Sequence, residues 1–186
     1  MVEDWIQRWR SVGDEAAAEA LYNHYHLRLF RLAFGLLGNS HEAEDVLQET
    51  MKYALENIGR YDASRAHFGT WLQTIAVSRA RDRQRRQKIM TNFLTRLFQQ
   101  PQYDTAPSAE RLVMQSQQHG VLIAAIQSLT PAQREVVLLR YWGNHSFPEI
   151  SQIVGKSEGT VKSRLRLAHQ QLQRLVDKPK QRGGSQ

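Results

Sequence analysis

Apolar residues recur three and four positions apart along most of this chain, the spacing that gathers side chains on one face of an α-helix. A long example runs from Leu21 through Tyr25, Leu29 and Leu32 to Leu36. Glycine and proline, which weaken or break helices, number 11 and 5 among 186 residues, and strand-like alternation is hardly seen. The sequence therefore predicts an all-α fold.

Three helices are predicted in the first half of the chain. The first runs from Asp14, a suitable N-cap, to Leu37. Ser40 is the predicted cap of the second, which ends near Gly59. The face of this second helix that we expect to be buried consists of Ala43, Val46, Leu47, Thr50 and Ala54. After the loop RYDASRAHFG, a third helix starts near Phe68 and continues into the basic segment RARDRQRRQK.

A change of composition divides the chain into two small helical domains. The segment QQPQYDTAPSAE is polar, holds two prolines and has no helical period, which predicts a flexible linker over residues 91–118. This linker would join an N-terminal domain, 1–90, to a C-terminal domain, 119–177, and a polar tail, 178–186, is predicted to be disordered. Met90–Phe98 carries a short apolar stripe that would pack on a partner or on the second domain, and we favour a contact within the protein.

The C-terminal domain carries the signals of a helix-turn-helix. The segments TPAQ and SFPE each place a hydroxyl cap three residues before Gln or Glu, the capping-box pattern that opens a helix. The second opens a short helix that Gly155 closes, and Ser157 caps the next helix. The predicted buried stripe of that helix consists of Val161, Leu165, Ala168, Leu172 and Leu175. Two short helices joined by such a turn form a motif whose second helix enters the major groove of DNA.

The helix that Ser157 caps carries polar and basic side chains on its other faces. Those predicted to lie nearest the bases or phosphates are Ser157, Glu158, Thr160, Lys162, Ser163 and Arg166. Gly159 would let the backbone approach the DNA closely. A net charge of +7 also favours a polyanionic partner. The alternative is a solvated amphipathic helix that binds nothing.

The helix predicted after Ser40 is acidic on its outer side, where Glu42, Glu44, Asp45, Glu49 and Glu56 stand against one Lys52. The spacing puts Asp45, Gln48, Glu49 and Lys52 on one face. A helix that faces DNA would not carry this charge, so we predict a contact with a basic or polar protein surface. Ordinary solvation and a metal–carboxylate site are the alternatives, although no His stands at a suitable spacing for a metal.

The third helix ends with the opposite charge, in Arg79, Arg81, Arg83, Arg85, Arg86 and Lys88, with Asp82 among them. This density suits a phosphate backbone. The loop before it and the start of the helix interleave basic and aromatic residues, namely Arg60, Tyr61, Arg65, His67, Phe68 and Trp71. That mixture favours unstacked single-stranded bases. Core packing is the alternative for Phe68 and, at least as strongly, for Trp71.

The sequence also lacks several features. It has no cysteine, which excludes disulfides and Cys-ligated zinc. No apolar run approaches the length of a membrane span, and the N-terminus MVEDWIQRWR lacks the apolar core of a signal peptide. We therefore expect a cytoplasmic protein without membrane insertion, and we predict no metal and no cofactor.

Surfaces for duplex and for opened strands, with an acidic docking face between them, suggest promoter opening. Four segments resemble the extracytoplasmic-function (ECF) group of bacterial sigma-70 family sigma factors: EAEDVLQETMKYA, FGTWLQTIAVSRARDRQRR, LTPAQREVVLLRYW and FPEISQIVGKSEGTVKSRLRLA. They stand in the family's order and spacing. The resemblance implies a protein that binds core RNA polymerase and promoter DNA, directs promoter recognition, helps to open the DNA and has no catalysis of its own. Many family members are held inactive by an anti-sigma factor.

The resemblance also implies roles for individual residues. The clamp helices of the polymerase's largest subunit would meet the face formed by Asp45, Gln48, Glu49 and Lys52, and the C-terminal domain would meet the flap of the second-largest subunit. The residues implied at the −10 element are Arg60, Tyr61, Asp62, Ser64, Arg65, Trp71, Ser78, Arg79, Arg83, Arg85 and Arg86. Those implied at the −35 element are Lys156, Ser157, Glu158, Gly159, Thr160, Lys162, Ser163, Arg164 and Arg166. The family usually has Asn at the position of Ser78 and often an aromatic residue at that of Met51.

Two other classes of function compete with this interpretation. A stand-alone helix-turn-helix regulator would need neither the acidic face nor the arginine-rich helix. A metal-dependent nuclease would need a convergent His or Asp set beside the carboxylates, which the sequence does not offer.

Overall fold

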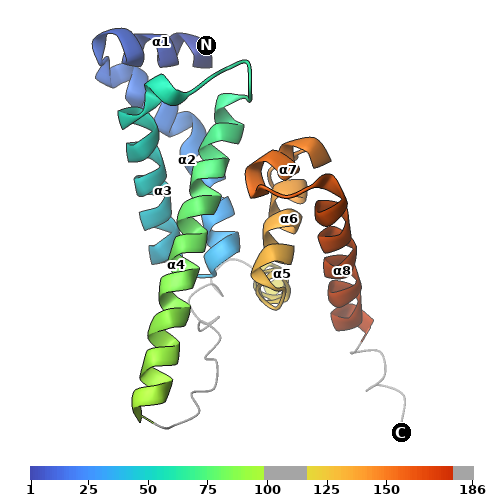
Figure 1. Cartoon of the computed structure of the whole chain (residues 1–186). Coiled ribbons are helices and arrows are strands. Elements are labelled where there is room, and N and C mark those ends of the chain that lie inside the picture. The colour runs from blue at the N-terminus through green and yellow to red at the C-terminus, as the bar shows by residue number, and fades with distance from the viewer. Residues whose placement is uncertain (99–116, 178–186) are drawn as a thin grey trace, which may run out of the picture. The chain divides into compact units, whose positions relative to one another are not determined.

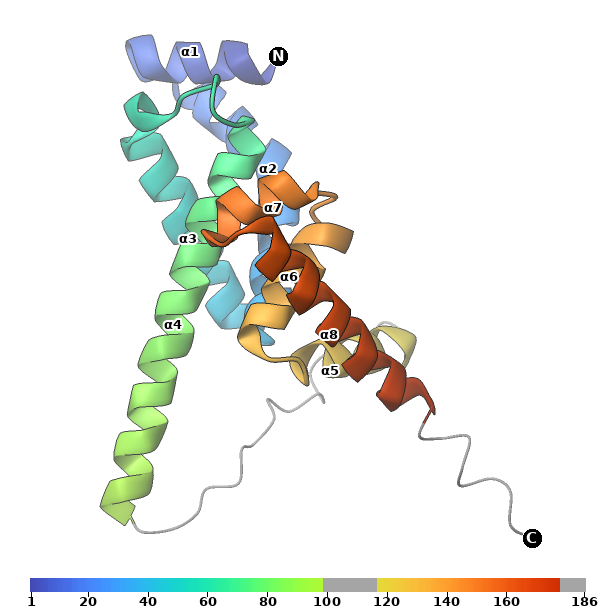
Figure 2. The same cartoon turned by 45° about the vertical axis from the view of Figure 1, so that its right-hand side comes forward.

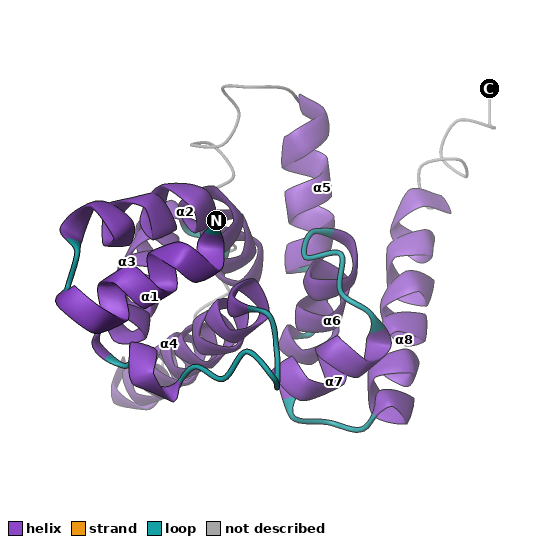
Figure 3. Cartoon of the chain, turned by 90° about the horizontal axis from the view of Figure 1, so that it is seen from above, coloured by secondary structure: helices purple, strands orange, loops and turns teal. Residues whose placement is uncertain are grey.

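The structure is a computed structural model that describes residues 1–98 and 117–177 (Figure 1). Within these ranges every regular element is a helix, which confirms the all-α prediction (Figure 3). Most of the predicted linker and the predicted tail lie outside the described residues. None of the helices described is long and apolar enough to span a membrane.

The chain divides into two compact units, residues 1–84 and 85–186. The elements that begin in the first unit are α1 (Val2–Val12), α2 (Glu15–Leu37), α3 (Ser40–Glu56), the 3-10 turn η1 (Ile58–Arg60) and α4 (Phe68–Phe98). The boundary falls inside α4, which continues to Phe98 through the apolar stripe predicted at Met90–Phe98. Ile89, Met90 and Phe93 in this part of α4 are exposed.

The first unit is a bundle of α2, α3 and α4, and α1 crosses one end of it in both views (Figure 1, Figure 2). Its core includes Leu21 and Leu29 of α2, Val46 of α3 and Leu72 of α4, all nearly inaccessible to solvent. The whole predicted inner face of α3 is buried. Gly69 brings the start of α4 close to α2, because a Cβ there would lie 3.0 Å from a ring carbon of Tyr25.

Helix caps in this unit follow the sequence with one exception. Asp14 caps α2 as predicted, and its carboxylate accepts hydrogen bonds from the backbone N–H groups of Ala16 and Ala17. The prediction that Ser40 caps α3 is wrong. Asn39 is the cap, since its Oδ1 accepts from the N–H of Glu42 at 3.0 Å and Ser40 is already helical.

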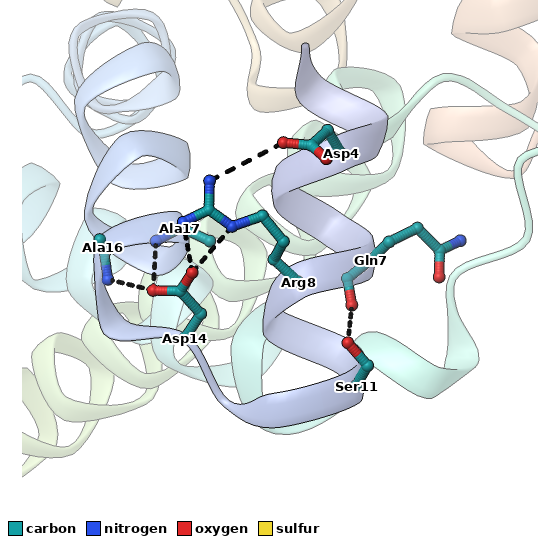
Figure 4. A network of polar contacts seen from close by, with 7 residues as sticks. All are labelled: Asp4, Gln7, Arg8, Ser11, Asp14, Ala16 and Ala17. Carbon is teal, nitrogen blue, oxygen red and sulfur yellow. Dashed lines mark hydrogen bonds and ion pairs between the residues drawn. The ribbon is translucent and has the colours of Figure 1, made fainter.

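The sequence prediction began the helical bundle at Asp14 and missed α1. Ile6 is the buried residue of α1, and Gly13, with φ of 65°, ends the helix in the left-handed conformation. Figure 4 shows Arg8 reaching from α1 to the carboxylate of Asp14, with Asp4 on its other side. The hydrogen bond from Arg8 lowers the pKa of Asp14. The turn between α1 and α2 is thus fixed by a side-chain contact.

The second unit holds α5 (Gln117–Gln127), α6 (Pro131–Tyr141), α7 (Phe147–Val154) and α8 (Glu158–Asp177). Both predicted capping boxes are present, Thr130 with Gln133 and Ser146 with Glu149. The core of α6, α7 and α8 includes Leu138, Leu139, Ile150 and Val161.

The second unit also contains a buried guanidinium that the sequence did not indicate. Arg134 of α6 donates to the carbonyls of Ile126, Gln127 and Leu129 at 3.2, 2.6 and 3.1 Å. These carbonyls lie at and after the end of α5, where a helix leaves acceptors without partners of its own. Burial lowers the pKa of Arg134. The side chain therefore ties α6 to the C-terminal end of α5.

Candidate nucleic-acid and protein interfaces

Helices α7 and α8 form the predicted helix-turn-helix. Gly155, with φ of 65°, ends α7, and its N–H donates to the carbonyl of Ser151. The hydroxyl of Ser157 accepts from the N–H of Thr160 at 3.4 Å and so caps the start of α8, as predicted. The turn between the helices is short, and it leaves the N-terminal end of α8 facing solvent.

Most side chains predicted to reach DNA are exposed on this end of α8. The exposed ones are Lys156, Ser157, Glu158, Lys162, Ser163 and Arg166, and the backbone at Gly159 is exposed as well. Thr160 and Arg164 are half-buried. One face of the helix therefore offers ammonium, guanidinium and hydroxyl groups to a ligand, and these are groups that bond base edges and phosphates.

The predicted apolar stripe of α8 is shorter than the sequence suggested. Val161, Leu165 and Ala168 are buried and Leu172 is half-buried. The prediction that Leu175 is buried is wrong, because this side chain is 39% exposed. Among the predicted members of the stripe, full burial therefore ends at Ala168.

The ring of Phe147 contacts two cationic side chains near the turn, a feature that sequence reasoning missed. The guanidinium carbon of Arg140 lies 5.2 Å from the centre of the Phe147 ring, and the ammonium of Lys162 lies 5.3 Å from it. Lys162 is also 3.4 Å from a carboxylate oxygen of Glu158. These contacts orient Lys162 and leave its side chain largely in solvent. The capping box explained Phe147 only as a helix start, so no sequence signal singled it out.

In the first unit, the loop between η1 and α4 lies on an aromatic cluster. The ring of Tyr61 is 5.1 Å from Phe68 and 5.5 Å from Trp71, and Phe68 is 5.5 Å from Trp71. Phe68 is buried and belongs to the core, whereas Tyr61 and Trp71 are half-buried. A half-buried aromatic pair can present ring surface to an unstacked base.

The tip of this loop is fixed by Asp62. Its Oδ1 accepts from the N–H of Ser64 at 2.9 Å and from the hydroxyl of Ser64 at 2.7 Å. The two Ser64 hydrogen bonds lower the pKa of Asp62. Arg60, Arg65 and His67 are exposed around this turn. The loop thus combines a defined backbone with basic side chains in solvent.

Two side chains of α1 donate to backbone carbonyls at the end of α3 and around η1, where this loop begins. Trp9 Nε1 donates to the carbonyl of Leu55 at 2.9 Å. Arg10 Nη2 donates to the carbonyls of Ile58 and Tyr61 at 2.9 and 3.1 Å. Sequence reasoning missed both residues, because nothing in a single sequence pairs positions that lie more than forty residues apart.

The acidic face of α3 is joined to α4 by one arginine. Arg83 Nη1 lies 2.9 Å from Asp45 Oδ2, and Nη2 lies 2.7 Å from Glu49 Oε1. Burial alone would lower the pKa of Arg83, but the hydrogen bonds that it donates to Glu49 and Asp45 raise it overall. The structure therefore brings Arg83, predicted among the DNA contacts, to the face predicted for polymerase.

The other predicted members of these sets are more accessible. Gln48, Glu49 and Lys52 are exposed on α3. On α4, Ser78, Arg85 and Arg86 are exposed. Arg79 is half-buried, and its guanidinium lies over the ring of Tyr53 at 5.2 Å. Among the residues that the structure describes, no group of three or more His, Cys, Asp or Glu could hold a metal ion.

Two known families match the two halves of the chain. Sigma-70 region 2 matches residues 21–89, and Sigma-70, region 4 matches residues 119–172. The first match covers the acidic face of α3, the loop and the basic part of α4. The second covers the helix-turn-helix.

Curated relatives are similar over most of the chain. It is 31% identical to the ECF RNA polymerase sigma factor SigW of Bacillus subtilis, an alignment that covers 88% of this chain and 91% of SigW. It is 31% identical to the ECF RNA polymerase sigma factor RpoE of Cereibacter sphaeroides, over 89% of this chain and 91% of that protein. The identity to the ECF RNA polymerase sigma factor BldN of Streptomyces coelicolor is 30% over 88% of this chain, which spans 62% of the length of BldN.

Solved structures share the fold. CnrH, solved in complex with the cytosolic domain of CnrY, superposes with a TM-score of 0.65 at 21% identity, covering 95% of this chain and 94% of CnrH. The sigma factor RpoE of Bartonella quintana, solved in complex with the anti-sigma factor NepR, gives a TM-score of 0.64 at 21% identity, covering 86% and 96%. The two sigma regions in their family order and the similarity to SigW over nearly its whole length lead to one conclusion: the chain belongs to the ECF RNA polymerase sigma factors.

Proposed function

We propose that this protein binds core RNA polymerase, directs it to promoters and helps to open promoter DNA, by binding and without catalysis of its own. The observation that carries the proposal is the presence in one chain of two different surfaces whose chemistry suits nucleic acid. One is a helix-turn-helix with an exposed basic end, and the other is a basic loop on half-buried aromatic rings. A stand-alone regulator of duplex DNA needs only the first.

The acidic face of α3 is the proposed polymerase contact. It would meet the clamp helices of the largest subunit through Asp45, Gln48, Glu49 and Lys52. The exposure of Gln48, Glu49 and Lys52 supports this assignment. Because Arg83 already bonds Asp45 and Glu49, it fixes how these two carboxylates are presented. The C-terminal domain is the proposed partner of the flap of the second-largest subunit.

The loop after η1 is the proposed site for the −10 element. Tyr61 and Trp71 would stack on or flank unpaired bases, and Asp62 with Ser64 fixes the turn of the loop beside these rings. The proposed phosphate contacts are Arg60, Arg65, Arg79, Arg85 and Arg86, with Ser78 nearby. For Arg83 to join them, its guanidinium would have to leave two carboxylates.

The N-terminal half of α8 is the proposed reader of the −35 element. Lys162 and Arg166 are its most favourable base or phosphate contacts, because both are exposed cations on this half of the helix. Contacts of this kind contribute roughly 1–3 kcal/mol of discrimination each when they are bidentate to a base. The remaining proposed contacts are Lys156, Ser157, Glu158, Gly159, Thr160, Ser163 and Arg164.

An anti-sigma factor is a further proposed partner. The Bartonella quintana RpoE structure contains the anti-sigma factor NepR, and the CnrH structure contains the cytosolic domain of CnrY. The similarity of fold supports a comparable regulator for this chain. Since core polymerase and promoter DNA are cytoplasmic in bacteria, we propose the same compartment for this protein.

Run-off transcription tests the proposed function. The purified chain would be added to bacterial core RNA polymerase on a library of double-stranded promoter fragments, with a reaction that lacks the chain as the control. We expect transcripts with defined start sites only when the chain is present. A chain that does not bind core polymerase at all would contradict the proposal and favour a stand-alone helix-turn-helix regulator.

A further inference from the structure

Helix α1 contacts the loop that we propose captures the −10 element. We infer that Arg10 of this helix is a positioning residue for promoter opening, which holds the loop in its binding conformation from outside the region 2 match. That match begins at residue 21, so α1 lies outside it. The inference rests on the proposed function and assigns part of it to a residue that touches neither DNA nor polymerase in the proposal.

Arg10 bonds backbone carbonyls at both ends of η1, the turn that precedes the loop. The same nitrogen, Nη2, donates to the carbonyl of Ile58 at 2.9 Å and to that of Tyr61 at 3.1 Å. Ile58 opens η1, and Tyr61 is the first residue after it. One guanidinium therefore bridges the two ends of the turn from which the loop departs.

Trp9 makes a third contact of the same kind. Its indole N–H donates to the carbonyl of Leu55, in the last turn of α3. Carbonyls at the end of a helix lack partners within the helix, and donors or cations placed there stabilise it. Two neighbouring side chains of α1 thus donate to carbonyls at the end of α3 and around η1, where the carbonyl of Ile58 also accepts from the N–H of Tyr61.

The position of Tyr61 connects these contacts to the aromatic cluster. Its carbonyl is held by Arg10, while its ring packs against Phe68 and Trp71. If the carbonyl were released, the backbone at Tyr61 would gain freedom and the ring would leave the cluster more often. A loop that is correctly formed only part of the time binds its ligand more weakly by that fraction.

Arg10 is separable from the docking of α1 itself. The helix is anchored by buried Ile6, and the solvent-accessible ion pair of Arg8 with Asp14 at the turn into α2 adds less than this burial (Figure 4). Trp5 adds an edge contact with the ring of His24. Loss of the Arg10 side chain should therefore leave α1 in place and free only the loop.

The test compares Arg10→Ala with Arg8→Ala, which removes the same charge from the same helix. Each full-length chain would be assembled with core polymerase. We would then measure how tightly each assembled complex binds a single-stranded non-template oligonucleotide. The oligonucleotide spans the −10 element of a promoter selected by run-off transcription. We expect Arg10→Ala to weaken this binding about tenfold, the scale of one lost charge-assisted hydrogen bond. Arg8→Ala should stay within about twofold of the unchanged chain, and Arg10→Lys, which keeps a charged donor, should restore part of the loss.

The affinity for core polymerase should be the same for all of these chains, since the contacts of Arg10 are with Ile58 and Tyr61 and not with the acidic face of α3. Equal weakening by Arg8→Ala would overturn the inference, because the effect would then follow from charge or from general docking of α1. So would unchanged strand binding by Arg10→Ala.

Amide hydrogen exchange separates this inference from the proposed function. In the chain without polymerase or DNA, Arg10→Ala should speed exchange at residues 58–67 and leave the core of α2 unchanged. Unchanged exchange in the loop would defeat the positioning role even if the protein is an active sigma factor. Faster exchange with no promoter-specific transcription from the unchanged chain would contradict the proposed function instead.

Discussion

Arg83 of α4 donates from Nη2 to Glu49 Oε1 of α3 over 2.7 Å, and the same guanidinium reaches Asp45 through Nη1. The contact joins a helix that we propose binds DNA to a helix that we propose binds polymerase. A guanidinium that bonds two carboxylates fixes their geometry better than a single ammonium would. The acidic face is therefore a preorganised surface whose shape depends on α4.

Reversal of charge on this face should weaken assembly with polymerase. We expect Asp45→Lys combined with Glu49→Lys to lower the affinity for core polymerase at least about tenfold, a change of about 1.4 kcal/mol. Affinity for a −35 duplex fragment should not change, because the helix-turn-helix lies in the other unit. Arg83→Gln is the matched control, since it breaks the same ion pairs and keeps both carboxylates. We expect this control to lower core affinity less than the double reversal, because the carboxylates remain although Arg83 no longer orients them. An equal loss would mean that their negative charge is not what polymerase binds.

Neutralisation of the N-terminal half of α8 should impair use of the −35 element. We expect Lys162→Ala with Arg166→Ala to reduce affinity for a −35 duplex by roughly 10- to 100-fold and to flatten its dependence on salt. Arg174→Ala removes a cation from the same helix, about 12–18 Å further along its axis, and should have little effect. Fluorescence anisotropy at several salt concentrations measures both quantities. Unchanged promoter choice by the double variant would mean that α8 has been assigned the wrong role.

Local sequence patterns predicted helices and caps well where the residues in contact are close in the sequence. The capping boxes at Thr130 and Ser146 need residues only three positions apart, and both formed as predicted. The buried face of α3 followed from its helical period. The N-terminal cap of α3 was misplaced by one residue, because Asn39 and Ser40 are both good caps and the sequence does not choose between them.

Contacts between distant positions could not be predicted in this way. Arg83 has a sequence separation of 34 from Glu49, and Arg10 one of 51 from Tyr61. In the sequence, Arg83 lies within a basic segment, which suggests phosphate binding. In the fold, it bonds two carboxylates instead. The apolar stripe of α8 was overestimated for a related reason, because the helical period persists to Leu175 although the packing surface does not.

The buried guanidinium of Arg134 should be important for the stability of the second unit. We expect Arg134→Ala to lower the free energy of unfolding by about 2–3 kcal/mol, because it leaves buried carbonyls at the end of α5 without their charged donor. Arg134→Lys keeps the charge but not the forked geometry, and its loss should be smaller. Urea unfolding of the full chain, followed by circular dichroism, measures the change. Equal stability of Arg134→Ala and the unchanged chain would contradict this role.

The capping box at the start of α7 should make the second unit sensitive to acid. Hydrogen bonds from Ser146 lower the pKa of Glu149 in the folded protein, with His145 adding a smaller effect. A carboxyl group whose pKa is lowered on folding stabilises the fold above its usual pKa, near 4.5, and this contribution is lost as the pH falls through the lower folded value. Ser146→Ala should lower the free energy of unfolding by about 1 kcal/mol at neutral pH and flatten this dependence on acid.

Thr130→Ala is the matched control, because it removes the equivalent cap of α6, where the partner is Gln133 and does not titrate. It should lower the free energy of unfolding by about as much at neutral pH and leave the dependence on acid unchanged. Urea midpoints between pH 3 and pH 7 compare the two variants, and parallel pH profiles would show that Glu149 is not the titrating group.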